Sequence, residues 1–214
     1  MTGTGLRDGS VAAAIRAHRL IAVLRRIEPH ERLLALVDEL AEAGVRVFEI
    51  TLDTPSGADD LAAVRGHLSA REDAYLVGAG TILGGDQLDA ARRSGADFGV
   101  SPILDAALVR ASVEGGLPFV PGAMTPSEIA AAWDAGATFV KLFPASAVGP
   151  QLVRELRGPL PDVALIPTGG VDGANAAAFL EAGAAAVGIG GSITRATADE
   201  RRALVRAVAE ARPR

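Results

Sequence analysis

Lysine occurs once in this 214-residue chain, at Lys141, although lysine and arginine together number 21. Arginine therefore serves almost every position at which a positive charge alone is needed. Only an amine can lose its proton near neutral pH and attack a carbonyl carbon, which a guanidinium cannot do. Lys141 lies in an apolar run where strand alternation places it beside Phe139 and Phe143, and desolvation there favours the neutral amine. We interpret Lys141 as a Schiff-base nucleophile; the alternatives are a lysine paired with a buried carboxylate and a lysine whose stem extends outward from a strand end.

A carboxylate, Glu49, lies in a second apolar run, between Phe48 and Ile50. A buried carboxylate requires a partner, and we expect Glu49 to meet Lys141 across the interior of the fold. Such a pair is suited to moving protons during a reaction. A purely structural ion pair is the alternative reading.

Two glycine-rich turns suggest an anion site. Main-chain N–H groups in such turns can approach a phosphate closely, although paired glycines also occur in ordinary tight turns. The candidate residues are Thr168, Gly169, Gly170, Gly190, Gly191 and Ser192.

Short apolar runs alternate with helical patterns along the whole chain, which predicts repeated β–α units. The expected strands are Leu20–Arg25, Val47–Leu52, Tyr75–Ala79, Phe98–Val100, Pro118–Pro121, Phe139–Phe143, Val163–Pro167 and Ala186–Gly190. Eight such units favour an α/β fold that is a single (β/α)8 TIM barrel over residues 1–214, with an extra N-terminal helix near Ser10–Arg19. An open doubly wound sheet competes, but no G-x-G-x-x-G fingerprint follows the first strand.

The ends of helices and strands add further detail. Thr125 to Glu128 forms a capping-box pattern, and helices are expected to end at Gly44, Gly95, Gly136 and Gly183. Reacting groups of such barrels come from the carboxyl ends of strands, where Arg25, Thr81 and Pro102 stand.

Composition excludes several classes of function. The chain is 49% hydrophobic and 22% charged with a formal net charge of −5, which predicts a globular protein without a basic surface for nucleic acid. It has no cysteine, and its three histidines do not match zinc-site spacing. Its apolar runs are too short to span a membrane. We expect a cytoplasmic protein with neither nucleic acid nor membrane as a partner.

Taken together, these residues resemble the aldolases that cleave 2-keto-3-deoxy-6-phosphogluconate (KDPG). The closely similar 6-phosphogalactonate and 4-hydroxy-2-oxoglutarate aldolases belong to the same family. The resemblance extends over nearly the whole chain and depends on the order and spacing of short motifs. These motifs are Ile21 to Arg25, Glu49 to Thr51, Gly78 to Thr81, Val100 to Pro102, Pro121-Gly122, Lys141 to Pro144, Pro167 to Gly170, and Gly190 to Ser192.

The resemblance implies a role for each candidate. Lys141 would form the Schiff base, and Glu49 would be the acid/base residue. Arg25 would hold the substrate carboxylate, while Thr81 and Pro102 would line the pyruvate-binding part. Gly169, Gly170, Gly191 and Ser192 would bind the 6-phosphate. It also implies a small 2-keto acid phosphate as partner, a homotrimer, and no metal or organic cofactor.

Two departures leave the substrate open. Asp53 stands where one branch of the family has arginine, and Arg25 is expected to supply that cation. Phe143 to Gln151 is similar to the phosphogalactonate members, whereas Ile166 to Gly170 is similar to the phosphogluconate members. Two other functions remain as alternatives: a phosphosugar isomerase or epimerase with Glu49 as base, and a non-catalytic sensor of phosphorylated sugar acids.

Overall fold

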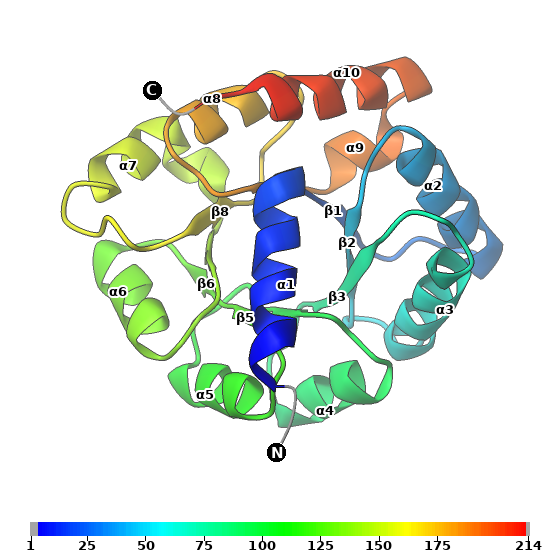
Figure 1. Ribbon diagram of the computed structural model, residues 1–214, viewed down its shortest axis with the longest axis horizontal. Coiled ribbons are helices and arrows are strands. Elements are labelled where there is room, and N and C mark those ends of the chain that lie inside the picture. Colours follow the sequence, from blue (N-terminus) through cyan, green and yellow to red (C-terminus); the bar gives the residue numbers. More distant parts are fainter. Residues whose placement is uncertain (1–3, 213–214) are drawn as a thin grey trace.

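The computed structural model describes the backbone of residues 4–212 and the side chains of residues 9–212. Its strands are β1 (Leu20–Leu24), β2 (Val47–Thr51), β3 (Leu76–Gly80), β4 (Gly99–Val100), β5 (Phe119–Val120), β6 (Gly122–Ala123), β7 (Val140–Leu142), β8 (Leu165–Pro167) and β9 (Val187–Ile189). Its helices are α1 (Thr4–His18), α2 (His30–Glu42), α3 (Gly57–Ser69), α4 (Gly85–Arg93), α5 (Ala106–Glu114), α6 (Pro126–Asp134), the 3-10 helix η1 (Ala145–Ala147), α7 (Gly149–Leu156), α8 (Ala176–Glu181), α9 (Gly191–Arg195) and α10 (Ala198–Glu210). Strands lie at the centre and most helices surround them (Figure 1).

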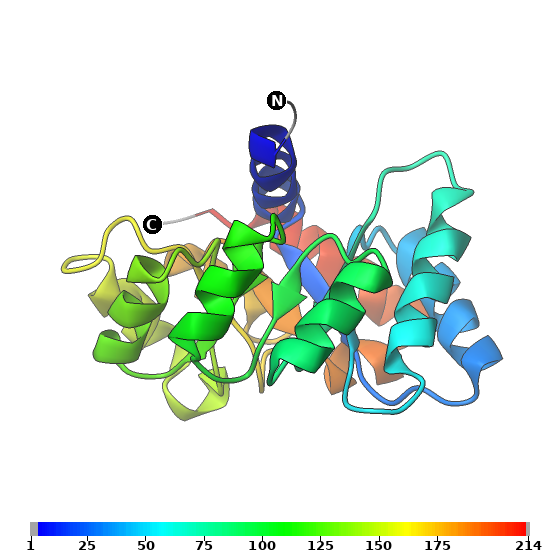
Figure 2. The same ribbon diagram turned by 90° about the horizontal axis from the view of Figure 1, so that it is seen from below.

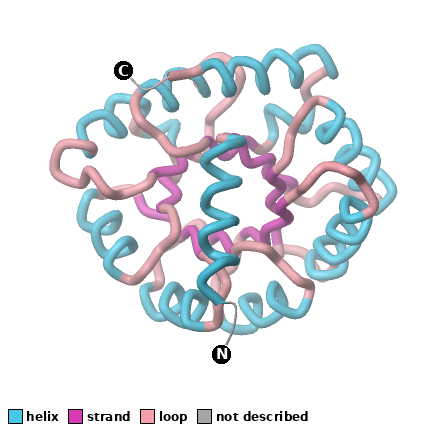
Figure 3. Tube along the Cα trace, viewed as in Figure 1, coloured by secondary structure: helices cyan, strands magenta, loops and turns pink. Residues whose placement is uncertain are grey.

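The strands form an α/β fold with a curled parallel sheet (Figure 3). Six strands pair in the order β5-β4-β3-β2-β1-β9, and three pair in the order β6-β7-β8. A parallel bridge between Thr168 and Gly188 connects the end of β8 to β9. The residues of β1 and β2 are all buried, as expected for strands of a parallel sheet covered by helices.

The fifth expected strand, Pro118–Pro121, proved wrong in its extent. The structure has two short strands here, β5 and β6, and they belong to different sheets. Pro121 stands between them and has no N–H to donate to a ladder. Its carbonyl still accepts a hydrogen bond from the Lys141 N–H at 2.8 Å, so the chain turns from β4 towards β7 at this residue.

Local signals in the sequence were confirmed. The Thr125 hydroxyl accepts from the Glu128 N–H, and the Glu128 carboxylate accepts from the Thr125 N–H, which completes the capping box of α6. The four glycines expected at helix ends all have positive φ. The helix before β1 begins at Thr4, earlier than the expected Ser10.

Apolar side chains pack in two layers. The outer layer lies between strands and helices and includes Leu36 and Leu40 of α2. The inner layer consists of side chains from the strands and from residues just before them, including Phe98 and Phe139, together with Ile15 of α1. Helix α1 lies across one end of the strands (Figures 1 and 2). It covers the amino-terminal end of the interior, so the site must open at the carboxyl end.

Within the described part of the chain, no helix is long and apolar enough to cross a membrane.

Candidate active site

Lys141 and Glu49 meet in the interior, as the sequence predicted. Lys141 is 4% exposed and Glu49 is 2% exposed, and Nζ lies 3.7 Å from Glu49 Oε1. This distance is too long for a hydrogen bond, and Oε1 has no hydrogen-bond partner among the described residues. Nζ also lies 5.3 Å from the centre of the Phe143 ring. A buried amine therefore lies close to a buried carboxylate oxygen that no described residue holds by a hydrogen bond.

The strands position this pair. Lys141 is the central residue of β7 and pairs with Gly122 of β6 and Ile166 of β8. Glu49 is the central residue of β2, beside β3. A Cβ at Gly80 of β3 would overlap Glu49 Oε1 and would lie 2.7 Å from its Cγ, so this glycine provides the space that the Glu49 side chain occupies.

A cavity of about 360 Å³ opens at the carboxyl ends of β1, β7, β8 and β9. It joins Lys141 and Arg25 to all six residues of the glycine-rich turns, which confirms that the structure brings these predicted residues together. Gly169 and Gly170 have φ of +83° and +78°, a region that side-chain-bearing residues rarely adopt. The Thr168 hydroxyl donates to the Ile166 carbonyl at 3.3 Å.

Arg25 lies at the mouth of the cavity, held by two partners. Its Nη1 donates to Asp53 Oδ2 at 2.9 Å and its Nη2 donates to the Thr81 hydroxyl at 3.1 Å. Burial acts to raise the pKa of Asp53, but the hydrogen bond from Thr51 and the charges of Arg25 and Arg26 outweigh it, and the pKa lies below its usual value. Asp53 is therefore ionised and fixes the Arg25 guanidinium.

Glu49, Thr81 and Pro102 are not among the residues that line this cavity. Glu49 and Thr81 lie directly behind it through their contacts with Lys141 and Arg25. Pro102 lies against Gly122, whose Cβ would overlap the Pro102 carbonyl, and Gly122 in turn pairs with Lys141. A larger cavity, of about 480 Å³, lies at the amino-terminal ends of the strands and contains none of the predicted site residues.

Sequence reasoning missed two charged residues of the cavity, Asp172 and Arg195. Asp172 Oδ1 accepts from the N–H groups of Ala174 and Asn175, so its carboxylate closes a turn. Arg195 ends α9 and its guanidinium lies over Gly191. The spacing of four residues between Gly191 and Arg195 was a signal that could have placed them on one face of a helical turn.

Comparison with known proteins was consistent with this geometry. The family model described as KDPG and KHG aldolase matches residues 11–207. The 2-dehydro-3-deoxy-6-phosphogalactonate aldolase of Escherichia coli strain K12 is 38% identical over 199 residues, which cover 90% of this chain and 95% of that protein. The 2-dehydro-3-deoxy-phosphogluconate aldolase of Pseudomonas aeruginosa is 37% identical and the match covers 77% of this chain and 73% of that one.

A solved structure of similar shape is the KDPG aldolase of Legionella pneumophila, with pyruvate captured as a covalent carbinolamine intermediate. Its TM-score is 0.78 at 27% identity, and the match covers 94% of this chain and 97% of that one. The match over residues 11–207 and the identity with full-length relatives establish that this chain belongs to the KDPG and KHG aldolase family of carbon–carbon lyases.

Proposed function

We propose that this protein is a class I aldolase that cleaves 2-keto-3-deoxy-6-phosphogluconate to pyruvate and glyceraldehyde 3-phosphate through a Schiff base on Lys141. The main support is one observation: the chain's single lysine is buried at a cavity and lies 3.7 Å from a buried carboxylate oxygen that has no hydrogen bond among the described residues.

The proposed reaction begins when the neutral Lys141 amine attacks the C2 ketone. Glu49 moves the protons that allow water to leave, and an iminium remains. Glu49, directly or through a water, then takes the C4 hydroxyl proton, the C3–C4 bond breaks, and its electron pair moves into the iminium to give an enamine. Protonation at C3 and hydrolysis of the imine release pyruvate and restore the amine.

Binding of the two ends of the substrate has separate support. Arg25 lies at the cavity beside Lys141, where a bidentate contact with the substrate carboxylate would hold the ketone against the amine. Thr81, bonded to Arg25, and Pro102, near β6, would complete the pyruvate-binding part. The glycine-rich turns, whose residues line the other side of the cavity, would bind the 6-phosphate through their N–H groups.

The proposal also specifies which of the two phosphorylated epimers is the preferred substrate. The E. coli relative named above acts, by its name, on 2-dehydro-3-deoxy-6-phosphogalactonate, and the P. aeruginosa relative on the phosphogluconate. Release of pyruvate should be measured side by side with both phosphorylated epimers and with 4-hydroxy-2-oxoglutarate. We expect the highest kcat/KM with the phosphogluconate, and a higher value with either other substrate would correct this assignment.

Borohydride reduction in the presence of pyruvate tests the covalent step. We expect a stable adduct on Lys141 in the wild-type protein and none in Lys141→Arg, detected by mass spectrometry. Equal trapping in the variant would place the nucleophile elsewhere. Phosphosugar binding without trapping would favour an isomerase or epimerase, and binding without any pyruvate release would favour a non-catalytic sensor.

We also propose a complete (β/α)8 barrel over residues 1–214 that assembles as a homotrimer. The Thr168–Gly188 bridge and the continuity of β5 with β6 support closure of the barrel. Leu83, Ile103 and Met124 follow β3, β4 and β6 with 50%, 50% and 38% exposure, and they offer apolar surface for self-association. Light scattering should give a mass three times that of the 21.8 kDa chain, and a monomer would contradict the proposal.

A further inference from the structure

Arg195 is an arginine at the cavity with no ion pair or hydrogen bond from its side chain to any described residue. Its guanidinium lies close to the backbone at the start of α9, because a Cβ on Gly191 would lie 2.7 Å from Nη1. Gly191 and Ser192 line the same cavity. The five N–H donors of this guanidinium are therefore available to a ligand beside the second glycine-rich turn.

Each other charged side chain that lines the cavity lies beside a described partner. Arg25 is bonded to Asp53 and Thr81, and Lys141 lies beside Glu49. The Asp172 carboxylate, which would repel an anion, accepts two backbone hydrogen bonds in its own turn. Among the described residues of this cavity, Arg195 is thus the cation without a side-chain partner, and it can bind a second anionic group apart from the carboxylate end.

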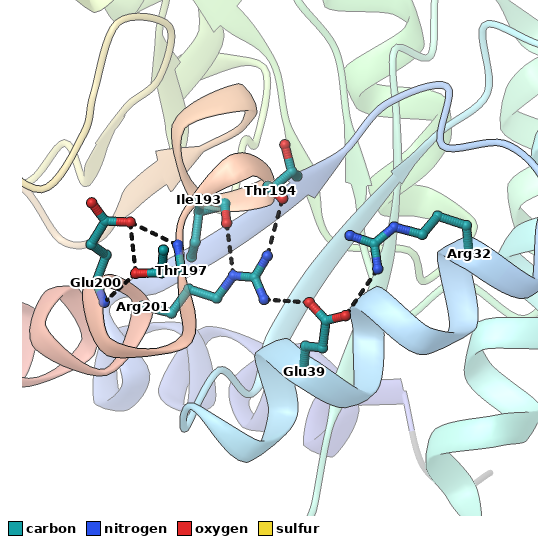
Figure 4. Close-up of polar contacts among 7 residues, drawn as sticks. All are labelled: Arg32, Glu39, Ile193, Thr194, Thr197, Glu200 and Arg201. Carbon is teal, nitrogen blue, oxygen red and sulfur yellow. Dashed lines mark hydrogen bonds and ion pairs between the residues drawn. The ribbon is translucent and has the colours of Figure 1, made fainter.

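A buried arginine fixes the backbone that leads into Arg195. Arg201 of α10 is 3% exposed, and it donates from Nε to the Ile193 carbonyl and from Nη2 to the Thr194 carbonyl, both at 3.0 Å. Its Nη1 lies 2.6 Å from Glu39 Oε2 of α2, and Glu39 also accepts from Arg32 (Figure 4). The two peptide carbonyls immediately before Arg195 are therefore tied to α2 and α10.

We propose that Arg195 is a specificity-determining residue that binds the phosphoryl group of the substrate, and that Arg201 is its positioning residue. This inference rests on the proposed function and extends its phosphate site beyond the main-chain N–H groups. A guanidinium presents paired donors that match two oxygens of a phosphate, and such charge-assisted bonds are stronger than neutral ones. Loss of the contact should weaken the binding of phosphorylated substrates about 10- to 100-fold.

The test compares Arg195→Ala with Arg202→Ala, which removes an exposed arginine of α10 that is paired with Asp199. Two readouts are measured: kcat/KM for 2-keto-3-deoxy-6-phosphogluconate and for its unphosphorylated form, and calorimetric binding of inorganic phosphate. Arg195→Ala should lose 10- to 100-fold on the phosphorylated substrate and on phosphate, with less than about threefold change on the unphosphorylated form. Arg202→Ala should behave as wild type. Equal loss on both substrates, or no loss on either, would overturn the assignment.

Arg201→Lys tests the positioning role, and Glu39→Gln is the milder substitution if the first does not fold. Either variant should raise KM for the phosphorylated substrate while kcat and the KM of the unphosphorylated form change little. A fall in kcat with both substrates would indicate a general structural role and would contradict the positioning role.

Borohydride trapping with pyruvate separates the aldolase proposal from the proposal that Arg195 binds phosphate. If wild type fails to trap, the aldolase proposal fails, while the loss of phosphate binding in Arg195→Ala still decides the role of Arg195.

Discussion

Glu49 Oε1 is a buried carboxylate oxygen without a hydrogen bond in the described part of the chain, although an amine lies 3.7 Å away. An unpartnered buried polar atom costs about 1–3 kcal/mol, and a buried ion pair contributes net stability only when its geometry is good. The pair with Lys141 is poorly arranged for stability. The proposed transfer of protons between Glu49 and a substrate bound at Lys141 would account for this geometry better than a structural ion pair does.

Glu49→Gln keeps the size of this side chain and removes its capacity to exchange protons. We expect kcat for pyruvate release to fall by about 10²- to 10⁴-fold, the usual contribution of a general acid–base. Trapping of pyruvate by borohydride should be slower but still detectable, because Lys141 is intact. Full activity of this variant in the pyruvate-release assay would remove Glu49 from the mechanism.

At the scale of elements, the space for the Glu49 side chain of β2 beside β3 depends on the absence of a side chain at residue 80. Gly80 faces the Glu49 carboxylate so closely that a Cβ would displace it. Misplacement of a catalytic group by about 1 Å can cost about 100-fold in rate. The identity of residue 80 on one strand therefore determines the position of the carboxylate on the next.

Gly80→Ala should lower kcat about 100-fold while the protein remains folded, as checked by circular dichroism. Gly84→Ala is the matched control, since it follows the same strand and its Cβ would meet nothing within 4 Å. The control should keep wild-type activity. If both variants keep it, the position of Glu49 is not set by Gly80.

At the scale of the whole molecule, the Arg201–Glu39 contact joins residues 162 positions apart in the chain and links α10 to α2. Hydrogen bonds from Arg201 and then Arg32 hold the pKa of Glu39 below its usual value. The folded state thus favours ionised Glu39 more than the unfolded state does. The resulting stability is complete above the usual glutamate pKa and is lost as the pH falls through the lowered one.

Glu39→Gln should lower the free energy of unfolding by about 1 kcal/mol at pH 7, a value limited by the exposure of the Glu39 side chain. The difference from wild type should shrink as the pH falls below about 4.3. Urea unfolding at a series of pH values measures this difference in the free energy of unfolding. If the difference between Glu39→Gln and wild type stays constant as the pH is lowered, the charge of Glu39 is not the cause of the lost stability.

Much of this protein was predictable from local patterns. Buried strands such as β1 and β2 follow from continuous apolar runs, and the α6 capping box follows from Thr125 and Glu128. The interest of Lys141, which the structure buries beside Glu49, follows from its being the only lysine in an arginine-rich chain, and its Schiff-base role stays a proposal. Each of these signals lies within a few residues or in the composition, so no knowledge of packing is needed.

Other features were decided by tertiary structure alone. The division of the fifth strand at Pro121 depends on which neighbours each half can pair with. The fixing of Arg25 by Asp53 and the place of Arg195 at the cavity depend on where loops from distant segments lie. Sequence pattern determines which side chains are buried along each element, because burial follows periodicity. It does not determine the distances between elements, which result from the packing of side chains that are far apart in the chain.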